Sequence, residues 1–472
     1  MSKVLMTDRR TFLRRGAMGA GAFWMLSLPE FAVRQAFGQL MSKSPYGAIS
    51  PKLDETTGLP LIQLPDGFRY RSYSWTGDLM SDGVACPNRH DGMAVVDEWH
   101  GKDDVVRDDD LHEDPHRDRR DLSHRLVLVR NHEGAGGTPY TRNRAITYAT
   151  DAKGGTTNLV FDGKRGEWLK SWSSLAGTWR NCAGAVTPWG TWITCEEVGN
   201  LPNHGWNFEV GPVKGNPKPL KDMGRFSHEA CMVDPRTGYV YQTEDSRSAG
   251  YYKFVPYRKG TLSAGELYML RVKNSSNLDL GAYHAPGTTW DVEWIRIDDP
   301  KALVKPVFSQ GSTGGGARFS RLEGAWWGDR TGYFLSTRGG SIGEGQVFEY
   351  DPQRETLTLI YDAPDARTLD NPDNITVSPR GGLLLCEDAG GKGSTEGARL
   401  VGLTLDGRVF TFAQNNIILT KDYNRRVRAG NYRKNEWAGA CYSPDGKWLF
   451  VNIQKPGVTF AITGPWGCSG PL

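Results

Sequence analysis

The sequence NCAGAVTPWGTWITCEE, residues 181–197, contains the pattern that decides the fold. It has a cysteine at its second position, crosses a tight Pro-Trp-Gly turn, and runs through an apolar strand to Cys195, Glu196 and Glu197. A polar turn with glycine, an apolar strand and then polar residues recur at 234–245, 328–338, 378–388 and 443–454. Residues 124–134 repeat the strand and its polar ending without the turn. Short strands separated by glycine turns indicate an all-β protein.

The spacing of this repeat predicts the architecture. Glycines of the turns lie at positions 190, 238, 332, 382 and 446, so the steps are 48, 94, 50 and 64 residues. Because the second step equals about two units, we expect one weakly marked unit near residue 285. A period near 48 residues is typical of four-stranded propeller blades. We therefore predict a single β-propeller domain at residues 41–472, with about six blades and loop insertions.

Two stretches have the composition of insertions. Residues 97–121 alternate acidic and basic side chains with little apolar content, which is typical of a solvated loop, and a substrate lid is the alternative. Residues 308–324 open with a glycine-rich run, which we expect to be flexible, and then become apolar and charged. Arg321 and Glu323 lie in this second part.

Overall charge and composition exclude some classes of partner. The chain has 472 residues, 58 glycines, 16 tryptophans and a formal net charge of only +3. A net charge this small for the chain length argues against nucleic acid or an anionic membrane held by bulk electrostatics. We therefore expect no nucleic-acid partner.

The N-terminal sequence predicts export. Arg9, Arg10, Phe12 and Leu13 directly precede a short run rich in Gly and Ala, and this arrangement resembles a twin-arginine signal. The apolar run is too short to span a bilayer comfortably, and small residues that could support cleavage follow it. We assign residues 1–40 to the signal peptide and expect no stable membrane anchor, with a retained anchor as the alternative. The resemblance implies the twin-arginine translocase as a partner and a periplasmic or secreted protein.

Cysteine usage points to one special thiol. Seven cysteines occur without a C-x-x-C pair or a regular spacing, so no disulfide framework is visible. In an oxidising compartment an odd thiol must be unpaired and buried, or bound to a metal. Cys182 is the candidate for metal binding because acids follow it within the same unit, and a small buried apolar residue is the alternative.

Acidic residues recur where the predicted strands end, and a propeller brings equivalent strand ends together on one face. Two carboxylates ~6 Å apart repel by roughly 3 kcal/mol at an effective dielectric of ~20, so a crowd of them needs protons, bases or cations. Carboxylate and Asn oxygens suit calcium or iron(III), and a thiolate suits iron. Cys182 is the candidate thiolate, and the polar residues expected to meet at this face are Glu133, Glu196, Glu197, Glu229, Glu244, Asp245, Glu323, Asp370, Asn371, Asp373, Asn374, Glu387, Asp388 and Glu436, with Arg321 beside them. His228 is expected to be structural, because HEACM lacks the second histidine of a zinc helix.

Several of these motifs together resemble one known family. The segments NHEG (131–134), NCAGAVTPWGTWITCEE (181–197), GRFSHEACMVDPRTGYVYQTED (224–245), FSRLEG (319–324) and DNPDNITVSPRGGLLLCED (370–388) are similar, in order, to the PhoX alkaline phosphatases. The similarity extends over roughly residues 125–455. It implies a β-propeller with a two-iron, three-calcium cluster that hydrolyses phosphate monoesters. The chain looks shorter than typical enzymes of that family, which predicts that some outer loops are missing.

The resemblance also implies roles for single residues. Cys182 would bind iron together with Glu196, Glu197 and Glu229. Arg321 would be the catalytic residue that contacts the phosphoryl group. The calcium ligands would be Glu133, Glu323, Asp370, Asn371 and Glu436, with Asn131 adding an amide oxygen. The sequence leaves open which acid of each adjacent pair is the ligand.

Two other functions remain compatible with the sequence. One is a calcium-dependent propeller hydrolase of the lactonase or phytase kind, which needs acids and Asn but no thiolate. The other is a non-catalytic periplasmic binding propeller in which metals only join the blades. Our leading prediction is a monomeric phosphatase that acts on a small-molecule phosphoester and uses iron(III) and calcium as cofactors.

Overall fold

The computed structural model describes residues 41–99, 124–388, 396–467 and 470–472. The predicted signal peptide at 1–40, most of the charged insertion at 97–121 and Cys468 lie outside the described residues. Within the described ranges, no helix combines the length and the apolar character needed to cross a membrane.

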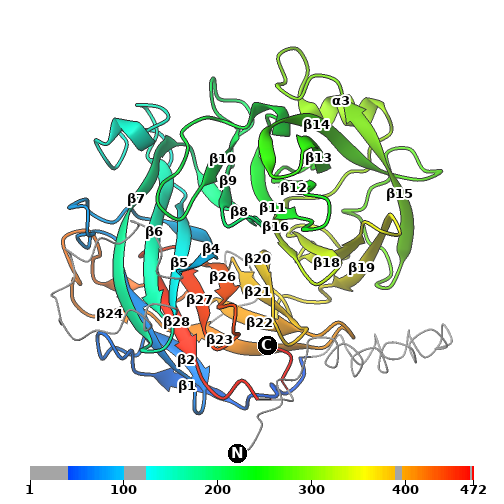
Figure 1. The fold of residues 1–472 in the computed structure, drawn as a ribbon. Helices are drawn as coiled ribbons and strands as arrows, with labels where there is room; N and C mark the ends of the chain where they lie inside the picture. The colour runs from blue at the N-terminus through cyan, green and yellow to red at the C-terminus, as the bar shows by residue number, and fades with distance from the viewer. Residues whose placement is uncertain (1–40, 100–123, 389–395, 468–469) are drawn as a thin grey trace, which may run out of the picture.

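The described residues form the predicted β-propeller (Figure 1). Antiparallel meanders surround a common centre, and each begins with its innermost strand. From the inside outward, the first meander contains β4 (His90–Trp99), β5 (Arg125–His132), β6 (Gly154–Asp162) and β7 (Glu167–Thr178). The second contains β8 (Asn181–Val186), β9 (Trp192–Glu196) and β10 (Asn207–Val210). The third contains β11 (His228–Val233), β12 (Val240–Glu244), β13 (Tyr251–Arg258) and β14 (Thr261–Val272).

Three further meanders complete the circle. The fourth contains β16 (Leu322–Trp327), β17 (Gly332–Ser336), β18 (Gln346–Asp351) and β19 (Thr356–Asp362). The fifth contains β20 (Pro372–Val377), β21 (Leu383–Glu387), β22 (Arg399–Leu403) and β23 (Val409–Asn415). The sixth contains β26 (Trp437–Tyr442), β27 (Leu449–Ile453), β28 (Val458–Thr463) and β3 (Arg69–Tyr73). The innermost strands contact one another in the order β4, β8, β11, β16, β20, β26 and back to β4. Every innermost strand therefore has a neighbour on both sides.

Strands from the N-terminal part close the circle. β3 pairs with β28, with Tyr70 opposite Ile462 and Ser72 opposite Phe460. β2 (Ile62–Pro65) pairs with β23, and β1 (Ile49–Lys52) pairs with β2. Two sheets thus combine strands from both ends of the described chain, so backbone hydrogen bonds hold the ring closed. A hairpin of β24 (Ile418–Leu419) and β25 (Gly430–Asn431) lies apart from these sheets.

The unit expected near residue 285 is not a separate meander, and this prediction is wrong. β15 (Thr289–Ile297) instead adds to the outer edge of the third meander through β14 and also pairs with β19. The long step in the repeat is therefore one meander plus an extra strand. Part of the run that we expected to be flexible forms a helix, α3 (Val307–Thr313). Gly311 of α3 packs so closely on Met269 that a Cβ atom there would lie 2.1 Å from its sulfur atom.

Aromatic side chains fill the wedges between adjacent sheets. Phe161, Trp168 and Phe450 pack edge to face between the first and the sixth meander, with ring centroids 4.8–5.6 Å apart. Tyr251 and Phe334 stack at 4.3 Å between the third and the fourth. The six described cysteines are buried and free, so they form no disulfide framework in the described part of the chain.

Around the centre the innermost strands approach one another very closely. A Cβ atom on Gly92 would lie 2.5 Å from Ala183 Cα on the next strand, and one on Gly324 would lie 2.7 Å from Asn374 Cα. On Gly439, which has a φ of +62°, it would lie 2.4 Å from the Asp91 carbonyl oxygen. Glycine at these positions lets the strands meet. The side chains next to these glycines therefore share one small space.

Candidate metal centre

Each meander brings the same three positions to the centre of the propeller. The first ring consists of the residues that directly precede the innermost strands: Arg89, Arg180, Ser227, Arg321, Asn371 and Glu436. The second ring consists of the second residues of these strands: Asp91, Cys182, Glu229, Glu323, Asp373 and Ala438. The third ring consists of the residues that directly follow the second strands: Glu133, Glu197, Asp245, Thr337, Asp388 and Gln454.

One hydrogen bond recurs in all six meanders and fixes the first ring against the third. The N–H of the third-ring residue donates to the carbonyl oxygen of the first-ring residue, at 2.9–3.0 Å in every case. Four first-ring residues have a left-handed backbone, with φ of +54° at Arg89, +49° at Arg180, +50° at Arg321 and +48° at Asn371. The repeat therefore sets the local geometry, and the side chains differ from one meander to the next.

A β-bulge presents the second ring. In all six innermost strands the register with the second strand shifts near the beginning. In five of them the shift includes the second residue of the strand, which is an acid or, in one case, Cys182. Bulges re-aim side chains and are common next to functional sites. In β26 the shift comes one residue later, and the second-ring residue is the apolar Ala438.

The third ring resolves which acid of each adjacent pair faces the centre. Glu197 lies 3.3 Å from the thiol of Cys182, which donates to its carboxylate. Glu196 instead accepts from the backbone N–H groups of Trp179, Gly205 and Trp206 at 2.8–3.1 Å and pairs with His204 at 2.7 Å. Successive residues of a strand point to opposite sides. Glu196 therefore binds the loop residues His204, Gly205 and Trp206, whereas Glu197 faces the Cys182 thiol.

The other two acid pairs follow the same rule. Glu244 accepts from the Gly250 N–H and the Tyr252 hydroxyl. Glu387 accepts from Arg399 and from the Asp370 N–H. The acids that follow them, Asp245 and Asp388, are the third-ring residues.

Two groups of side chains have the proximity of metal ligands. Glu133, Cys182 and Glu197 form one group, and Glu229, Glu323 and Asp373 form the other, with ligand atoms within 4.8 Å of one another in each. Both carboxylate oxygens of Glu229 are buried without a hydrogen-bond partner in the described part of the chain. The same holds for Oε1 of Glu323, although it lies 2.7 Å from the Arg321 guanidinium. Buried oxygens without donors fit a cation.

Electrostatics at the centre disfavour the charged forms of these acids. Burial, reinforced by the neighbouring acids, raises the pKa of Glu229 and of Glu323 well above the ordinary range. Burial also raises the pKa of Glu197 and of Asp373, to about 8 in each case. The pKa of the Cys182 thiol is raised for the same reasons. Without cations these groups hold protons, and cations would replace the protons.

Three arginines partly offset the negative charge. Arg89 and Arg180 contact the two carboxylate oxygens of Glu133 at 3.0 and 2.9 Å, and Arg180 also reaches Glu197 at 3.0 Å. Arg321 forms a bidentate pair with Asp245, at 2.8 Å for both bonds. The rings hold many more carboxylates than these arginines can neutralise, which again fits bound cations.

The structure brings most of the predicted site residues together. Glu133, Cys182, Glu197, Glu229 and Glu323 belong to the two close groups, and Arg321 contacts Glu323 directly. Glu436 lies in the first ring, where burial and then Asp373 and Asp91 raise its pKa.

Three predicted ligands have other surroundings. The Asn131 amide donates to the Cys182 and Ala183 carbonyls, and its oxygen accepts from Trp192 and Thr194, so it braces three strands. Glu196 binds the loop at His204, Gly205 and Trp206 and does not face the thiol. Asp370 accepts from the Asn371 amide, which also donates to Glu344, and its backbone N–H binds Glu387. Asp370 Oδ2 and Asn371 Oδ1 have no hydrogen-bond partner among the described residues.

Sequence reasoning placed Asp373 among the central acids without naming it as a ligand, and it missed Asp91, Arg89 and Arg180. A sequence signal for them exists, because the innermost strands begin RHDG, RNCA, SHEA, RLEG, NPDN and EWAG at positions 89, 180, 227, 321, 371 and 436. Each has a polar or charged residue first, and five have an acid or cysteine third. Aligning the strand beginnings, in addition to the turn glycines, reveals all six units.

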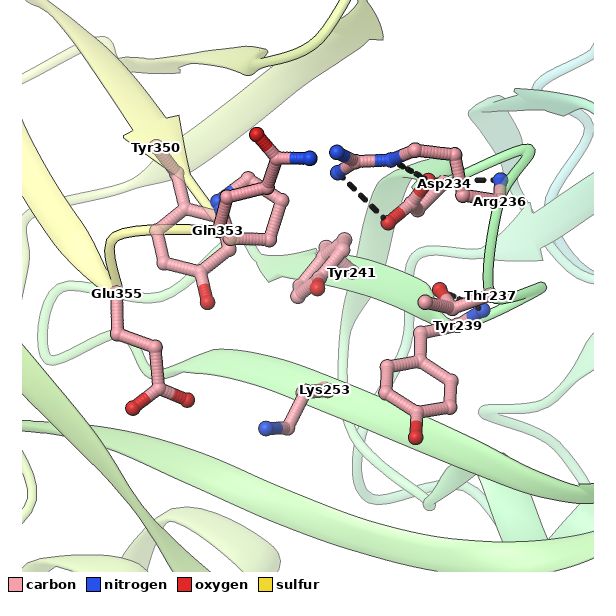
Figure 2. A pocket seen from close by; sticks show the side chains of 10 residues that line it. Asp234, Arg236, Thr237, Tyr239, Tyr241, Lys253, Tyr350, Gln353 and Glu355 are labelled. Carbon is pink, nitrogen blue, oxygen red and sulfur yellow. Dashed lines mark hydrogen bonds and ion pairs between the residues drawn. The ribbon is translucent and has the colours of Figure 1, made fainter.

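A separate cavity of about 290 Å³ lies at the opposite end of the third and fourth meanders (Figure 2). It is lined by the β11–β12 turn, by Lys253 of β13 and by the β18–β19 turn. Figure 2 shows Lys253 and Glu355 facing into it, while Arg236 is paired with Asp234 at 3.0 Å. Both close groups of candidate metal ligands lie elsewhere. This cavity is therefore not the metal centre.

Glu196→Gln and Glu197→Gln form a matched pair that separates the two acids. Glu196→Gln leaves one acceptor oxygen for three backbone N–H groups that share two in the unaltered chain, so it should lower stability by about 1–3 kcal/mol while metal content stays unchanged. Glu197→Gln should lower metal content and change the stability of the metal-free protein less than Glu196→Gln does below pH 8, where the raised pKa of Glu197, about 8, favours its protonated form. Thermal melting and elemental analysis check both variants, and loss of metal from Glu196→Gln alone would contradict the assignment.

Metal-free protein should become less stable as the pH rises. The folded-state pKa values of Glu197 and Asp373 are about 8, against ordinary values of 4.5 and 3.8. Between these limits the folded protein binds more protons than the unfolded chain, so stability decreases with pH. We expect the chelated protein to melt at a lower temperature at pH 8 than at pH 6, and calcium to reduce or reverse the difference.

The double variant Glu197→Gln, Asp373→Asn provides the control for this pH effect, because it removes both titrating groups. It should show a smaller pH dependence than the unaltered chain. An identical pH dependence in the two chelated proteins would contradict the proposed origin of the effect.

Comparison with known proteins identifies the family of this chain. The family described as "Alkaline phosphatase PhoX" matches residues 44–457. Among solved structures, the chain is similar to a protein described as a putative gluconolactonase, with 10% identity, a TM-score of 0.40 and coverage of 88% of this chain and 98% of the other. It is also similar to a luciferin-regenerating enzyme, with 9% identity, a TM-score of 0.32 and coverage of 71% and 92%. No curated protein matches the chain. Because the match covers nearly all of the described sequence, this chain belongs to the PhoX alkaline phosphatase family.

Proposed function

We propose that this protein hydrolyses phosphate monoesters with iron(III) and calcium bound at the centre of the propeller. The observation that carries the proposal is the two close groups of side chains, one containing Cys182 and the other containing Glu229, whose carboxylate oxygens have no hydrogen-bond partner among the described residues, and Glu323, which contacts Arg321. Membership of the PhoX family supports a hydrolase that acts on phosphate esters.

The donor atoms favour a division of the metals between the two close groups. Cys182, Glu133 and Glu197 would hold iron, because a thiolate suits iron and calcium has little affinity for sulfur. The family resemblance instead implied Glu229 at iron and Glu133 at calcium, and the grouping of the side chains favours exchanging these two roles. Glu229, Glu323 and Asp373 offer only oxygen atoms, which suits calcium. Asp370 Oδ2 and Asn371 Oδ1 would contribute to a further calcium position. When bound, these cations would bind phosphoryl oxygens and neutralise charge as the ester bond breaks.

Arg321 has the geometry of a phosphate-binding residue. Its Nε and Nη2 atoms bond Asp245, which fixes the plane of the guanidinium. Nη1 takes no part in these bonds, and the side chain is 33% exposed. A fixed guanidinium with a spare donor can hold a phosphoryl oxygen and stabilise the charge that develops on it.

We also propose that the protein is exported through the twin-arginine translocase and acts as a monomer in the periplasm or outside the cell. The support is the Arg9–Arg10 pair before a short apolar run. Replacing both arginines by lysine should leave full-length precursor in the cytoplasm, as fractionation would detect. Unchanged export of this double variant would contradict the proposal.

Elemental analysis combined with a phosphoester assay tests the function. We expect purified protein to contain iron and calcium and to release phosphate from p-nitrophenyl phosphate. Cys182→Ala should lose iron and most activity, because it removes the only thiol in either ligand group. Cys441→Ala is the matched control, since Cys441 is also a buried cysteine of an innermost strand but packs in an apolar cluster.

Three outcomes would contradict this assignment. Full activity in protein free of metals would exclude metal-dependent hydrolysis. A harmless Cys182→Ala variant that still needs calcium would favour a calcium hydrolase of the lactonase or phytase kind. Metal-loaded protein that hydrolyses no phosphoester, and melts lower after metal removal, would favour a binding propeller.

A further inference from the structure

We propose that Arg180 is a second phosphate-positioning residue in addition to Arg321, and that Arg89, Arg180 and Arg321 form a cationic collar over the buried acids. This inference rests on the proposed function, because it concerns how the same site binds a phosphoryl group. Its first support is positional. All three arginines occupy the first ring, directly before an innermost strand, in three different meanders.

Backbone conformation argues that these arginines are present for their side chains. Each has a φ between +49° and +54°, the left-handed region that favours Gly or Asn. A residue other than glycine there costs roughly 1 kcal/mol or more. Asn371 fills the equivalent position of the fifth meander, so the turn itself does not require arginine. Strained residues of this kind often mark functional sites.

Exposure shows that the collar changes the charge that a ligand meets first. Side chains of Arg89, Arg180 and Arg321 are 38%, 41% and 33% exposed. The acids that they contact, Glu133, Glu197, Asp245 and Glu323, are only 2–10% exposed. At these four acids, solvent therefore meets guanidinium groups before carboxylates, whereas Glu436 is a partly exposed acid of the first ring. A positive rim over an acidic floor can attract a phosphate dianion that the acids alone would repel.

Arg180 has the same relation to one ligand group that Arg321 has to the other. It bridges Glu133 and Glu197, two members of the Cys182 group, as Arg321 bridges Asp245 and Glu323 beside the Glu229 group. Its Nε and Nη2 atoms make these contacts, and Nη1 takes no part in them. A phosphoryl group held between the two ligand groups would therefore have an arginine beside each group.

Arg89 takes a secondary role in the collar. Among the described residues its ion pair is with Glu133, through Nη1 at 3.0 Å, on the carboxylate oxygen that Arg180 does not use. It should therefore act mainly through the overall positive potential of the rim. A potential of this kind is screened by salt, whereas a direct contact is less affected.

The test compares Arg180→Gln, Arg180→Lys and Arg89→Gln with Arg236→Gln in metal-loaded protein. Arg236 is an exposed arginine paired with Asp234 beside the separate cavity, so it is a matched control. Calorimetry measures the affinity for inorganic phosphate, kinetics measure KM and kcat for p-nitrophenyl phosphate, and elemental analysis follows the metals. Phosphate affinity can be measured whether or not the protein hydrolyses esters, so failure of the collar and failure of the function are distinguishable.

We expect Arg180→Gln to weaken phosphate binding by about tenfold or more, the loss typical of a charge-assisted hydrogen bond. KM should rise more than kcat falls, with metal content unchanged, and Arg180→Lys should restore part of the affinity. Arg89→Gln should have a smaller effect that disappears at high salt. Wild-type phosphate affinity in a fully metal-loaded Arg180→Gln variant would overturn the proposal.

Should Arg180→Gln lose metal, Arg180→Lys decides the question, because it keeps a positive charge beside Glu133 and Glu197. Full metal content with weakened phosphate binding in the lysine variant would support a direct contact. Full metal content with wild-type phosphate binding would show that Arg180 only neutralises the two acids, and would overturn the proposal.

Discussion

Mutual repulsion of buried acids is the constraint on which the rest of this structure depends. Ligand atoms in each central group lie within 4.8 Å of one another, and two carboxylate charges at that distance repel by about 3 kcal/mol at an effective dielectric of ~20. Arg89, Arg180 and Arg321 contact only some of these acids. Protons or cations must supply the remaining positive charge. Too little positive charge beside these acids has two consequences: the pKa of Glu229 is raised, and its carboxylate oxygens have no hydrogen-bond partner among the described residues.

One local device, repeated in every meander, produces the crowding. The residue before the innermost strand is bonded to the residue after the second strand, and a bulge presents the side chain between them. Small residues next to the bulge let neighbouring strands approach within contact distance. The chemistry differs because the side chains differ. The sixth meander presents Ala438 and Gln454 where most of the others present acids, so the negative charge is not evenly distributed around the axis.

Sequence reasoning predicted the fold and much of the centre because both depend on a repeat that is visible in one chain. The turn glycines identify the bend between innermost and second strands, and NCAG and RLEG mark two of the bulges. It failed near residue 285, because an edge strand such as β15 has the same short apolar pattern as a strand within a blade. It could not choose between Glu196 and Glu197. Successive side chains of a strand point to opposite sides, but the sequence does not show which side faces the centre of the propeller. Asp91 was missed because its strand lacks the turn motif by which the other units were aligned.

The central claim is that Cys182 and the acids around it hold metal ions. Anomalous diffraction from crystals of the protein as purified, recorded on both sides of the iron absorption edge, tests it most directly. Our account predicts an iron peak within bonding distance of Cys182 Sγ and Glu197, together with electron density for calcium beside Glu229 and Glu323. A Cys182 thiol that still donates to Glu197, with no anomalous peak between the two ligand groups, would contradict it.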